Sequence, residues 1–196
     1  VSLDGRLAPP GGGAAQIGGR GDRQVLEEAL AWADACLIGG RTLRVHGSTW
    51  LSHAVPRLDQ RRRQGRPDQP AAVVVSRGGI FDPQLRFFSQ PLQRWLLGPG
   101  QMAPPTGFHA AMPLVGWPEA LMALAAEGLQ RLVLLGGAEL AGALLQERLV
   151  DELQLTLCPL LLGGPHSWLP NGVRLDPNRW QLQEQRLLEG DELLLR

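Results

Sequence analysis

The sequence contains neither lysine nor tyrosine, and all 19 of its basic residues are arginine. Without lysine the chain cannot form a Schiff base, link pyridoxal phosphate or supply the lysine of a P-loop. Without tyrosine, no phenol can donate a proton. Arginine, histidine, serine, threonine and the carboxylates are therefore the groups left to carry chemistry.

Cysteine is scarce, and long apolar runs are missing. Cys36 and Cys158 each lie in a short apolar run, which predicts buried free thiols and fits a reducing, cytoplasmic setting. No apolar run approaches the roughly 18 residues of a membrane helix, and no signal peptide is recognisable. The chain begins at Val1 without methionine, so we expect a truncated first strand.

Charge of one sign does not dominate the chain. The formal net charge is 0, so no global field attracts nucleic acid or anionic lipid, and we expect a small-molecule partner instead. The only basic run, Arg61-Arg62-Arg63 with Arg66, lies among Gln, Pro and Asp. We interpret it as a solvated loop, with a phosphate-binding patch as the alternative. The length of 196 residues suits one domain, 1–196.

The most informative stretch is residues 131–164. An apolar run at 132–135 predicts a buried strand, Gly136 and Gly137 follow it, and 138–146 has the spacing of a helix. Paired glycines let a ligand approach the backbone closely, and the helix start favours an anion. The alternative is a tight turn without a ligand.

Two earlier strands end in the same way. A buried strand at 35–38 runs into Gly39-Gly40-Arg41-Thr42, and a β-branched strand at 71–75 runs into Ser76-Arg77-Gly78-Gly79. Arginine can pair with a phosphate in bidentate fashion, and a hydroxyl can hydrogen-bond it. Because ligands of parallel sheets bind beyond the carboxyl ends of the strands, three such turns predict a nucleotide-phosphate site.

The remaining pattern completes an α/β fold. We expect a mainly parallel central sheet with helices on both faces, closed by an antiparallel C-terminal hairpin at its edge. The expected elements are helices at 19–33 and 118–127, short strands at 95–97 and 113–115, a strand at 153–162, and hairpin strands at 180–188 and 192–196.

Three blocks resemble one known family: VSLDGRLA at the start, LIGGRTL in the middle, and LVLLGGAELAGALLQERLVDELQLTLCPLLLGG. They are similar to the riboflavin-biosynthesis pyrimidine reductases, the C-terminal reductase half of bacterial bifunctional deaminase-reductases. The resemblance implies a dihydrofolate-reductase-like fold and NADPH as hydride donor. The implied reaction reduces the ribosyl group of a phosphoribosylamino-pyrimidine to a ribityl chain. Members of this family tend to be homodimers.

The resemblance also implies roles for individual residues. Thr42 and Ser76 match positions that contact NADPH, and the turn that includes Gly137, Ala138, Glu139 and Leu140 matches the pyrophosphate side. Arg41 and Arg77 are our own hypotheses for phosphate contacts, with the 2′-phosphate as one candidate.

Several substrate-side positions depart from the family pattern. Leu135 stands where the family has an acidic residue tied to substrate, and His46-Gly47-Ser48 replaces its acidic turn. The other departures are Ala14, Gln16, Leu30 and His53. Lost polar partners are expected to cost about 10⁴ in discrimination, so this protein either holds the same substrate with other residues or reduces something else.

Three functions stay open. The first is the NADPH-dependent pyrimidine reductase, the second a paralogous reductase of another small carbonyl or imine, and the third a non-catalytic nucleotide-binding module. For a proton donor we consider Asp4, which could equally stabilise its turn, and His46, which could equally be a surface residue. His109 and His166 lack partners at metal-ligand spacing, so no metal site is expected.

Overall fold

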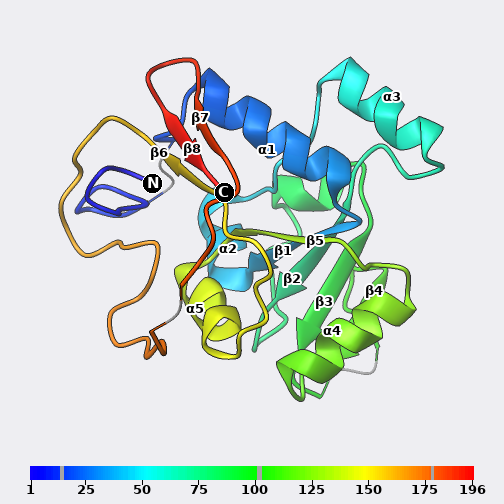
Figure 1. Cartoon of the computed structure of the whole chain (residues 1–196). Helices are drawn as coiled ribbons and strands as arrows, with labels where there is room; N and C mark the ends of the chain where they lie inside the picture. Colours follow the sequence, from blue (N-terminus) through cyan, green and yellow to red (C-terminus); the bar gives the residue numbers. More distant parts are fainter. Residues whose placement is uncertain (14–15, 101–102, 178) are drawn as a thin grey trace. The chain divides into compact units, whose positions relative to one another are not determined.

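The computed structural model describes residues 1–13, 16–100, 103–177 and 179–196, and its helices and strands alternate along most of the chain. In order they are α1 (Arg20–Trp32), β1 (Ala35–Gly39), α2 (Gly40–His46), α3 (Val55–Arg63), β2 (Ala71–Val75), the 3-10 helix η1 (Arg86–Ser89), β3 (Arg94–Gly98), β4 (Ala110–Pro113), α4 (Trp117–Ala126), β5 (Leu132–Gly136), α5 (Ala138–Gln146), β6 (Leu155–Leu157), β7 (Gln185–Leu187) and β8 (Leu193–Leu195) (Figure 1). The α/β class predicted from the sequence is confirmed.

The chain divides into two compact units. The larger comprises Glu27–Gly137, and the smaller combines Val1–Leu26 with Ala138–Arg196. The larger unit contains a five-stranded sheet in the order β4-β3-β2-β1-β5, and all four pairings in it are parallel. The predicted parallel sheet is therefore confirmed.

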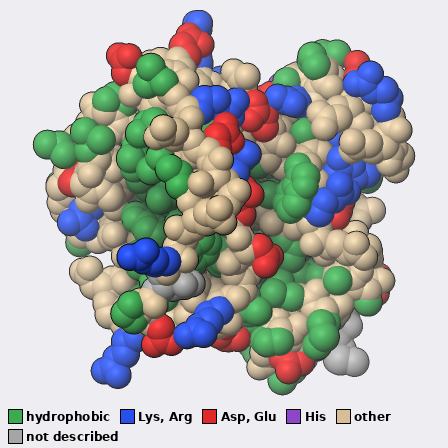
Figure 2. All heavy atoms as spheres, viewed as in Figure 1, with side chains coloured by type: hydrophobic (Ala, Val, Ile, Leu, Met, Phe, Trp, Pro, Cys, Tyr) green, Lys and Arg blue, Asp and Glu red, His purple; other side chains and the backbone are tan. Residues whose placement is uncertain are grey.

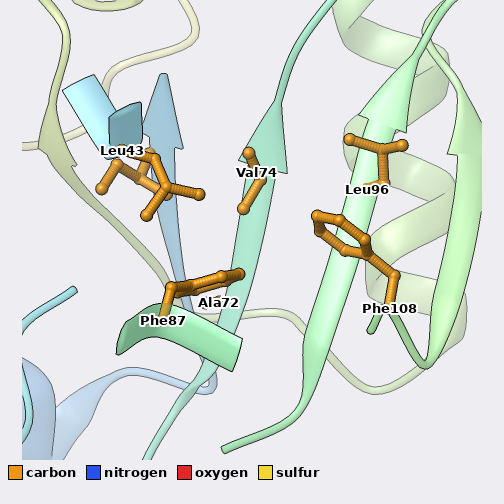
Figure 3. Close-up of a cluster of buried hydrophobic side chains, with 7 residues drawn as sticks. Leu43, Ala72, Val74, Phe87, Leu96 and Phe108 are labelled. Carbon is orange, nitrogen blue, oxygen red and sulfur yellow. The ribbon is translucent and has the colours of Figure 1, made fainter. Parts of the chain in front are cut away.

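Both faces of this sheet are buried. On one face, Ile38, Ala72, Val74 and Leu96 pack with Leu43 of α2, Phe87 of η1 and Phe108, and Figure 3 shows these side chains converging. On the other face, Leu37, Val73 and Leu97 are also buried. A parallel sheet covered on both sides needs apolar residues on both faces, which explains why its strands are continuous apolar runs.

The smaller unit contains the C-terminal hairpin. β7 and β8 are antiparallel, as predicted, but β8 also pairs with β6, so the three form a separate sheet in the order β6-β8-β7. The expectation that the hairpin forms an edge of the parallel sheet is therefore wrong in this detail. Regular strand pairing covers only three residues of each predicted hairpin run.

Other element boundaries also shift. The strand predicted at 113–115 is β4 at Ala110–Pro113, and only Leu155–Leu157 of the run at 153–162 pairs as a strand. The helix α2 follows β1 without a loop, although the sequence analysis placed only a glycine turn there. By contrast, α5 has the predicted bounds.

The interpretation of the arginine run as a solvated loop is wrong for Arg61, and the first three arginines of the run lie in α3 rather than in a loop. Arg61 lies in α3 and is only 1% exposed, and its guanidinium donates hydrogen bonds to the carbonyls of Leu30, Ala31 and Ala33 and to that of Pro67. The last carbonyls of a helix have no partner within the helix. Arg61 therefore caps the C-terminal end of α1.

Two general expectations can be compared with the structure. Cys36 and Cys158 are free and buried, as predicted. Across the described ranges, no helix combines the length and apolar character needed to cross a membrane.

Arginine and acidic side chains are interspersed on the face drawn in Figure 2, in keeping with the zero formal net charge.

Candidate functional site

Three glycine-bearing turns lie at one edge of the five-stranded sheet. β1 is the neighbour of both β2 and β5, and all three strands run parallel, so their carboxyl ends meet at this edge (Figure 1). The turns after them carry Gly39 to Thr42, Ser76 with Arg77, and Gly136 with Gly137. The structure thus brings together the predicted cofactor-binding residues of the larger unit, at what we call the carboxyl edge.

The ends of β1 and β5 approach each other closely at their glycines. A Cβ placed on Gly39 would lie 3.7 Å from the Gly136 carbonyl oxygen and 3.8 Å from the Gly137 Cα. Gly137 has φ of 111°, a conformation that side-chain-bearing residues rarely adopt. Thr42 lies between the two glycine pairs, because its Cγ2 would be 3.4 Å from a Cβ on Gly136. Gly39, Gly136 and Gly137 are half-buried, and the half-buried Thr42 lies beside them.

Ser76 occupies the other side of β1. A Cβ on Gly40 would lie 2.9 Å from both Cβ and Oγ of Ser76, so only glycine fits there without displacing the serine. Ser76 is buried, and its Oγ accepts the Gly79 N–H at 3.3 Å, which leaves the hydroxyl proton available to a ligand oxygen.

Gly98 at the end of β3 belongs to this edge, and the sequence analysis gave it no role. A Cβ on Gly98 would lie 2.4 Å from the Ser76 carbonyl oxygen, a separation that no side-chain-bearing residue tolerates. The signal that could have found it was present, because Gly98 ends a strand just as Gly39 and Gly136 do.

The two arginines predicted to contact phosphate are exposed. Arg41 follows Gly40 in the first turn of α2, and Arg77 follows Ser76 beyond β2. Both therefore begin at the carboxyl edge, and their guanidinium groups are accessible to a phosphate.

Ala138, Glu139 and Leu140 form the first turn of α5. They follow Gly137 directly in the chain but belong to the smaller unit. Leu140 is buried and Glu139 is exposed, so only the backbone N–H groups of this turn suit an anionic ligand.

Leu135, which replaces the family's acidic residue, lies at an irregularity of β5. The register between β1 and β5 pairs Leu37 with Leu134 and then Ile38 with Gly136, so Leu135 is the extra, unpaired residue of a β-bulge. A bulge changes the direction of a side chain and is frequent beside active sites. This chain has an aliphatic group at that position.

Asp4 lies in the smaller unit, where its carboxylate is fully engaged. It accepts hydrogen bonds from Ser2 Oγ at 2.6 Å, from the Leu162 N–H at 3.1 Å and from the Gly163 N–H at 2.8 Å. These bonds, the one from Ser2 foremost, lower the pKa of Asp4 to about 2. Asp4 is therefore ionised at neutral pH, which supports its turn-stabilising alternative.

His46 is the last residue of α2 and is exposed. At 1.5 Å per residue, it lies roughly 9 Å along the helix from Gly40. Its role as proton donor stays a prediction.

The substrate-side departures are spread over different environments. Leu30 is completely buried, His53 is exposed, and Ala14 lies outside the described residues. Among the residues that the structure covers, no group of three or more His, Cys, Asp or Glu side chains could hold a metal ion.

Comparison with known proteins identifies the family. Residues 1–191 match the model of the RibD C-terminal domain. The chain is 27% identical over 175 residues to the 2,5-diamino-6-ribosylamino-4(3H)-pyrimidinone 5′-phosphate reductase of Methanothermobacter thermautotrophicus, covering 84% of this chain and 76% of that protein.

It is also 31% identical over 184 residues to the riboflavin biosynthesis protein RibD of Mycobacterium tuberculosis, covering 85% of this chain. The matched segment spans only 53% of that relative, about half of its length. A pyrimidine reductase-like protein from Corynebacterium diphtheriae superposes with a TM-score of 0.79 at 21% identity, over 99% of this chain and 86% of that one, which shows a shared fold. Because the family model spans nearly the whole sequence, the chain belongs to the RibD C-terminal domain family.

Proposed function

We propose that the protein is an NADPH-dependent reductase of riboflavin biosynthesis, which transfers a hydride to the ribosyl group of a phosphoribosylamino-pyrimidine. The observation that carries this proposal is the convergence of three glycine-bearing turns with Thr42, Ser76 and two arginines at the carboxyl edge. The relative from Methanothermobacter is named as the reductase of a ribosylamino-pyrimidinone 5′-phosphate, which supports the reaction class. We further propose that residues 1–196 are a single reductase domain.

The residues at the carboxyl edge fit a phosphorylated dinucleotide. Gly39 and Gly137 are half-buried residues without a Cβ, Gly40 makes room for Ser76, and Ser76 and Thr42 offer hydroxyl donors. Arg41 and Arg77 would pair with phosphate groups. In the smaller unit, taken by itself, the first-turn N–H groups of α5, from Ala138 to Leu140, are suited to a pyrophosphate. When bound, NADPH supplies the hydride, and this chain's residues fix its orientation.

A specific observation favours a second candidate, a paralogous reductase of another carbonyl or imine. Leu135 puts an aliphatic side chain on the bulge, where the family's acidic residue would bind a polar substrate. A site that has lost its polar partners discriminates poorly in favour of a polar substrate. Turnover of the phosphoribosylamino-pyrimidine, measured by NADPH oxidation, separates the two reductases.

The test of cofactor binding is a fluorescence titration with NADPH and NADH. Arg41→Gln and Arg77→Gln are expected to weaken NADPH binding about tenfold or more, because a charge-assisted hydrogen bond contributes about 1.5–3 kcal/mol. Weakened NADPH binding with unchanged NADH binding would assign the arginine to the 2′-phosphate. Arg63→Gln is the matched control, since Arg63 is an exposed arginine of α3. Absence of micromolar binding of either nucleotide would contradict both reductases and favour a bare scaffold that has kept the fold.

We also infer a homodimer in a reducing, cytoplasmic compartment. Leu3, Leu161 and Leu187 of the smaller unit are 61%, 75% and 72% exposed, and such apolar groups are suited to burial in an interface. The two free, buried thiols fit a reducing compartment. A dimer makes the melting temperature rise with protein concentration, which tests the inference.

A further inference from the structure

A cavity lies at the edge of the five-stranded sheet opposite the carboxyl edge. Its volume is about 450 Å³, and it is lined by residues that immediately precede or begin strands, among them Asp34 before β1, Ala71 of β2 and Gln93 before β3. Parallel strands of five residues separate this amino edge from the carboxyl edge by roughly 15 Å. The cavity, which we call the amino-edge cavity, therefore lies apart from the proposed NADPH site.

Two arginines contribute to its wall. Arg61 donates from Nε and Nη1 to four backbone carbonyls. Arg66 donates from Nη1 to the Trp32 carbonyl at 2.7 Å and from Nη2 to Gln64 Oε1, but its buried Nε has no partner among the residues that the structure describes. Both arginines line the cavity.

The two carboxylates in the cavity wall are each paired with an arginine outside the lining. Asp34 in the wall pairs with Arg131 at 2.6 Å and lies 3.8 Å from Arg66, and Asp68 pairs with Arg62 at 2.7 Å. Arg61, only 1% exposed, forms no ion pair with any carboxylate in the described part of the chain. A buried cation is costly unless it is paired, so this wall favours an added negative charge.

The remainder of the lining limits the size and character of a ligand. Pro67, Pro91, Leu92 and Leu129 contribute apolar surface. The volume of about 450 Å³ falls within the range of small-molecule pockets, roughly 300–1,000 Å³. A bare ion would leave most of this space unfilled, whereas an oxyanion carried on an apolar group would fill it.

We propose that the amino-edge cavity is a second ligand site, which binds a small organic oxyanion. Arg61 and Arg66 bind the charged group, and the apolar part of the ligand packs against Leu92 and Leu129. The oxyanion is a phosphate or a carboxylate, since guanidinium groups bind both. Binding there orders the end of α1 through the same two arginines, whose other donors hold its last carbonyls.

The experiment is an amide NMR titration of the whole chain with four probes: phenyl phosphate, benzoate, inorganic phosphate and phenol. Phenyl phosphate or benzoate is expected to cause saturable shifts at Gly65, Gln93 and Gly128, and the tighter of the two identifies the oxyanion. Uncharged phenol is expected to cause none there. Shifts confined to the carboxyl edge, or no saturable shift with any anion, would overturn the proposal.

Variants then test two features of the cavity, the guanidinium of Arg66 and the free volume. Arg66→Gln is expected to weaken binding about tenfold or more, while the exposed Arg63→Gln leaves it unchanged. Gln93→Trp fills the cavity while leaving both arginines in the sequence, and it is expected to abolish binding. This variant keeps the test decisive if Arg66→Gln fails to fold. Unaltered affinity in folded Arg66→Gln or in Gln93→Trp contradicts the proposal.

Discussion

At the scale of single residues, the contacts of Asp4 favour one of its two predicted roles, the turn anchor over the proton donor. A proton donor must hold its proton near neutral pH, whereas a turn anchor acts as an anion. Ser2 Oγ and two backbone N–H groups bond the Asp4 carboxylate, and its pKa falls to about 2. The sequence reveals the Asp-Gly turn, but Leu162 and Gly163 are more than 150 residues away, so local reasoning cannot find them.

Asp4→Asn is expected to lower the melting temperature by a few degrees while leaving turnover intact. Because the pKa of Asp4 in the folded protein lies below the ordinary aspartate value of 3.8, the carboxylate stabilises the fold above about pH 4. That contribution is lost as pH falls from about 4 to about 2, so the variant's melting temperature should depend less on pH in this window. Thermal melts from pH 2 to 7 measure this, and a kcat that falls 100-fold in folded D4N would restore Asp4 as the proton donor.

The glycines at the ends of β1 and β5 could be predicted because the signal for them is local in the sequence. A buried apolar run that stops at Gly-Gly predicts a strand end, and three such ends in parallel strands must share one edge. Gly40 and Gly98 also have to be glycine because a Cβ on either would clash with Ser76, which follows β2. Their spacing in the sequence does not reveal these contacts with Ser76. The ligand-binding roles of these turns remain predictions.

At the scale of elements, α1 shows what a sequence pattern misses. Its N-terminal end is held by Glu192, which accepts the N–H groups of Gly19 at 2.5 Å and Asp22 at 2.9 Å. Its C-terminal end is capped by Arg61. A carboxylate at the start of a helix and a guanidinium at its end both suit the helix dipole. Both come from distant segments, so the apolar periodicity predicted the helix but not its caps.

The same element explains why the arginine run was misread. A cluster of like charges among polar residues usually indicates a solvated loop. Arg62 and Arg63 are exposed, as that rule expects, whereas Arg61 projects from the same helix into the interior. What separates them is the position of acceptors about 30 residues earlier in the chain.

Arg61→Met is expected to destabilise the fold by about 3 kcal/mol, because it leaves the last carbonyls of α1 buried without donors. Urea unfolding followed by circular dichroism measures the change, and Arg63→Met, which alters an exposed arginine of α3, should stay within about 0.5 kcal/mol of the parent. An equal loss in the two variants would mean that helix propensity in α3, rather than the cap on α1, determines the effect.

At the scale of the whole molecule, the two compact units share a helix. The boundary between them falls within α1, after Leu26, and the second crossing joins Gly137 to Ala138 between β5 and α5. If one unit unfolded alone, it would have to break α1 in the middle, and a shortened helix is marginally stable in water. The chain continuity of α1 therefore couples the two units energetically, as the proposed single domain requires.

Thermal unfolding is accordingly expected to be one cooperative transition, in which the calorimetric enthalpy equals the van't Hoff enthalpy evaluated for the proposed homodimer. Saturation with NADPH at about 100 times its Kd should shift that transition upward as a whole, since it adds about 2.7 kcal/mol to the folded state. Arg61→Met, altered only in the larger unit, should shift it downward as a whole. Two resolved transitions, with only one displaced by the variant, would mean that α1 breaks at the boundary and that the chain contains two domains rather than one.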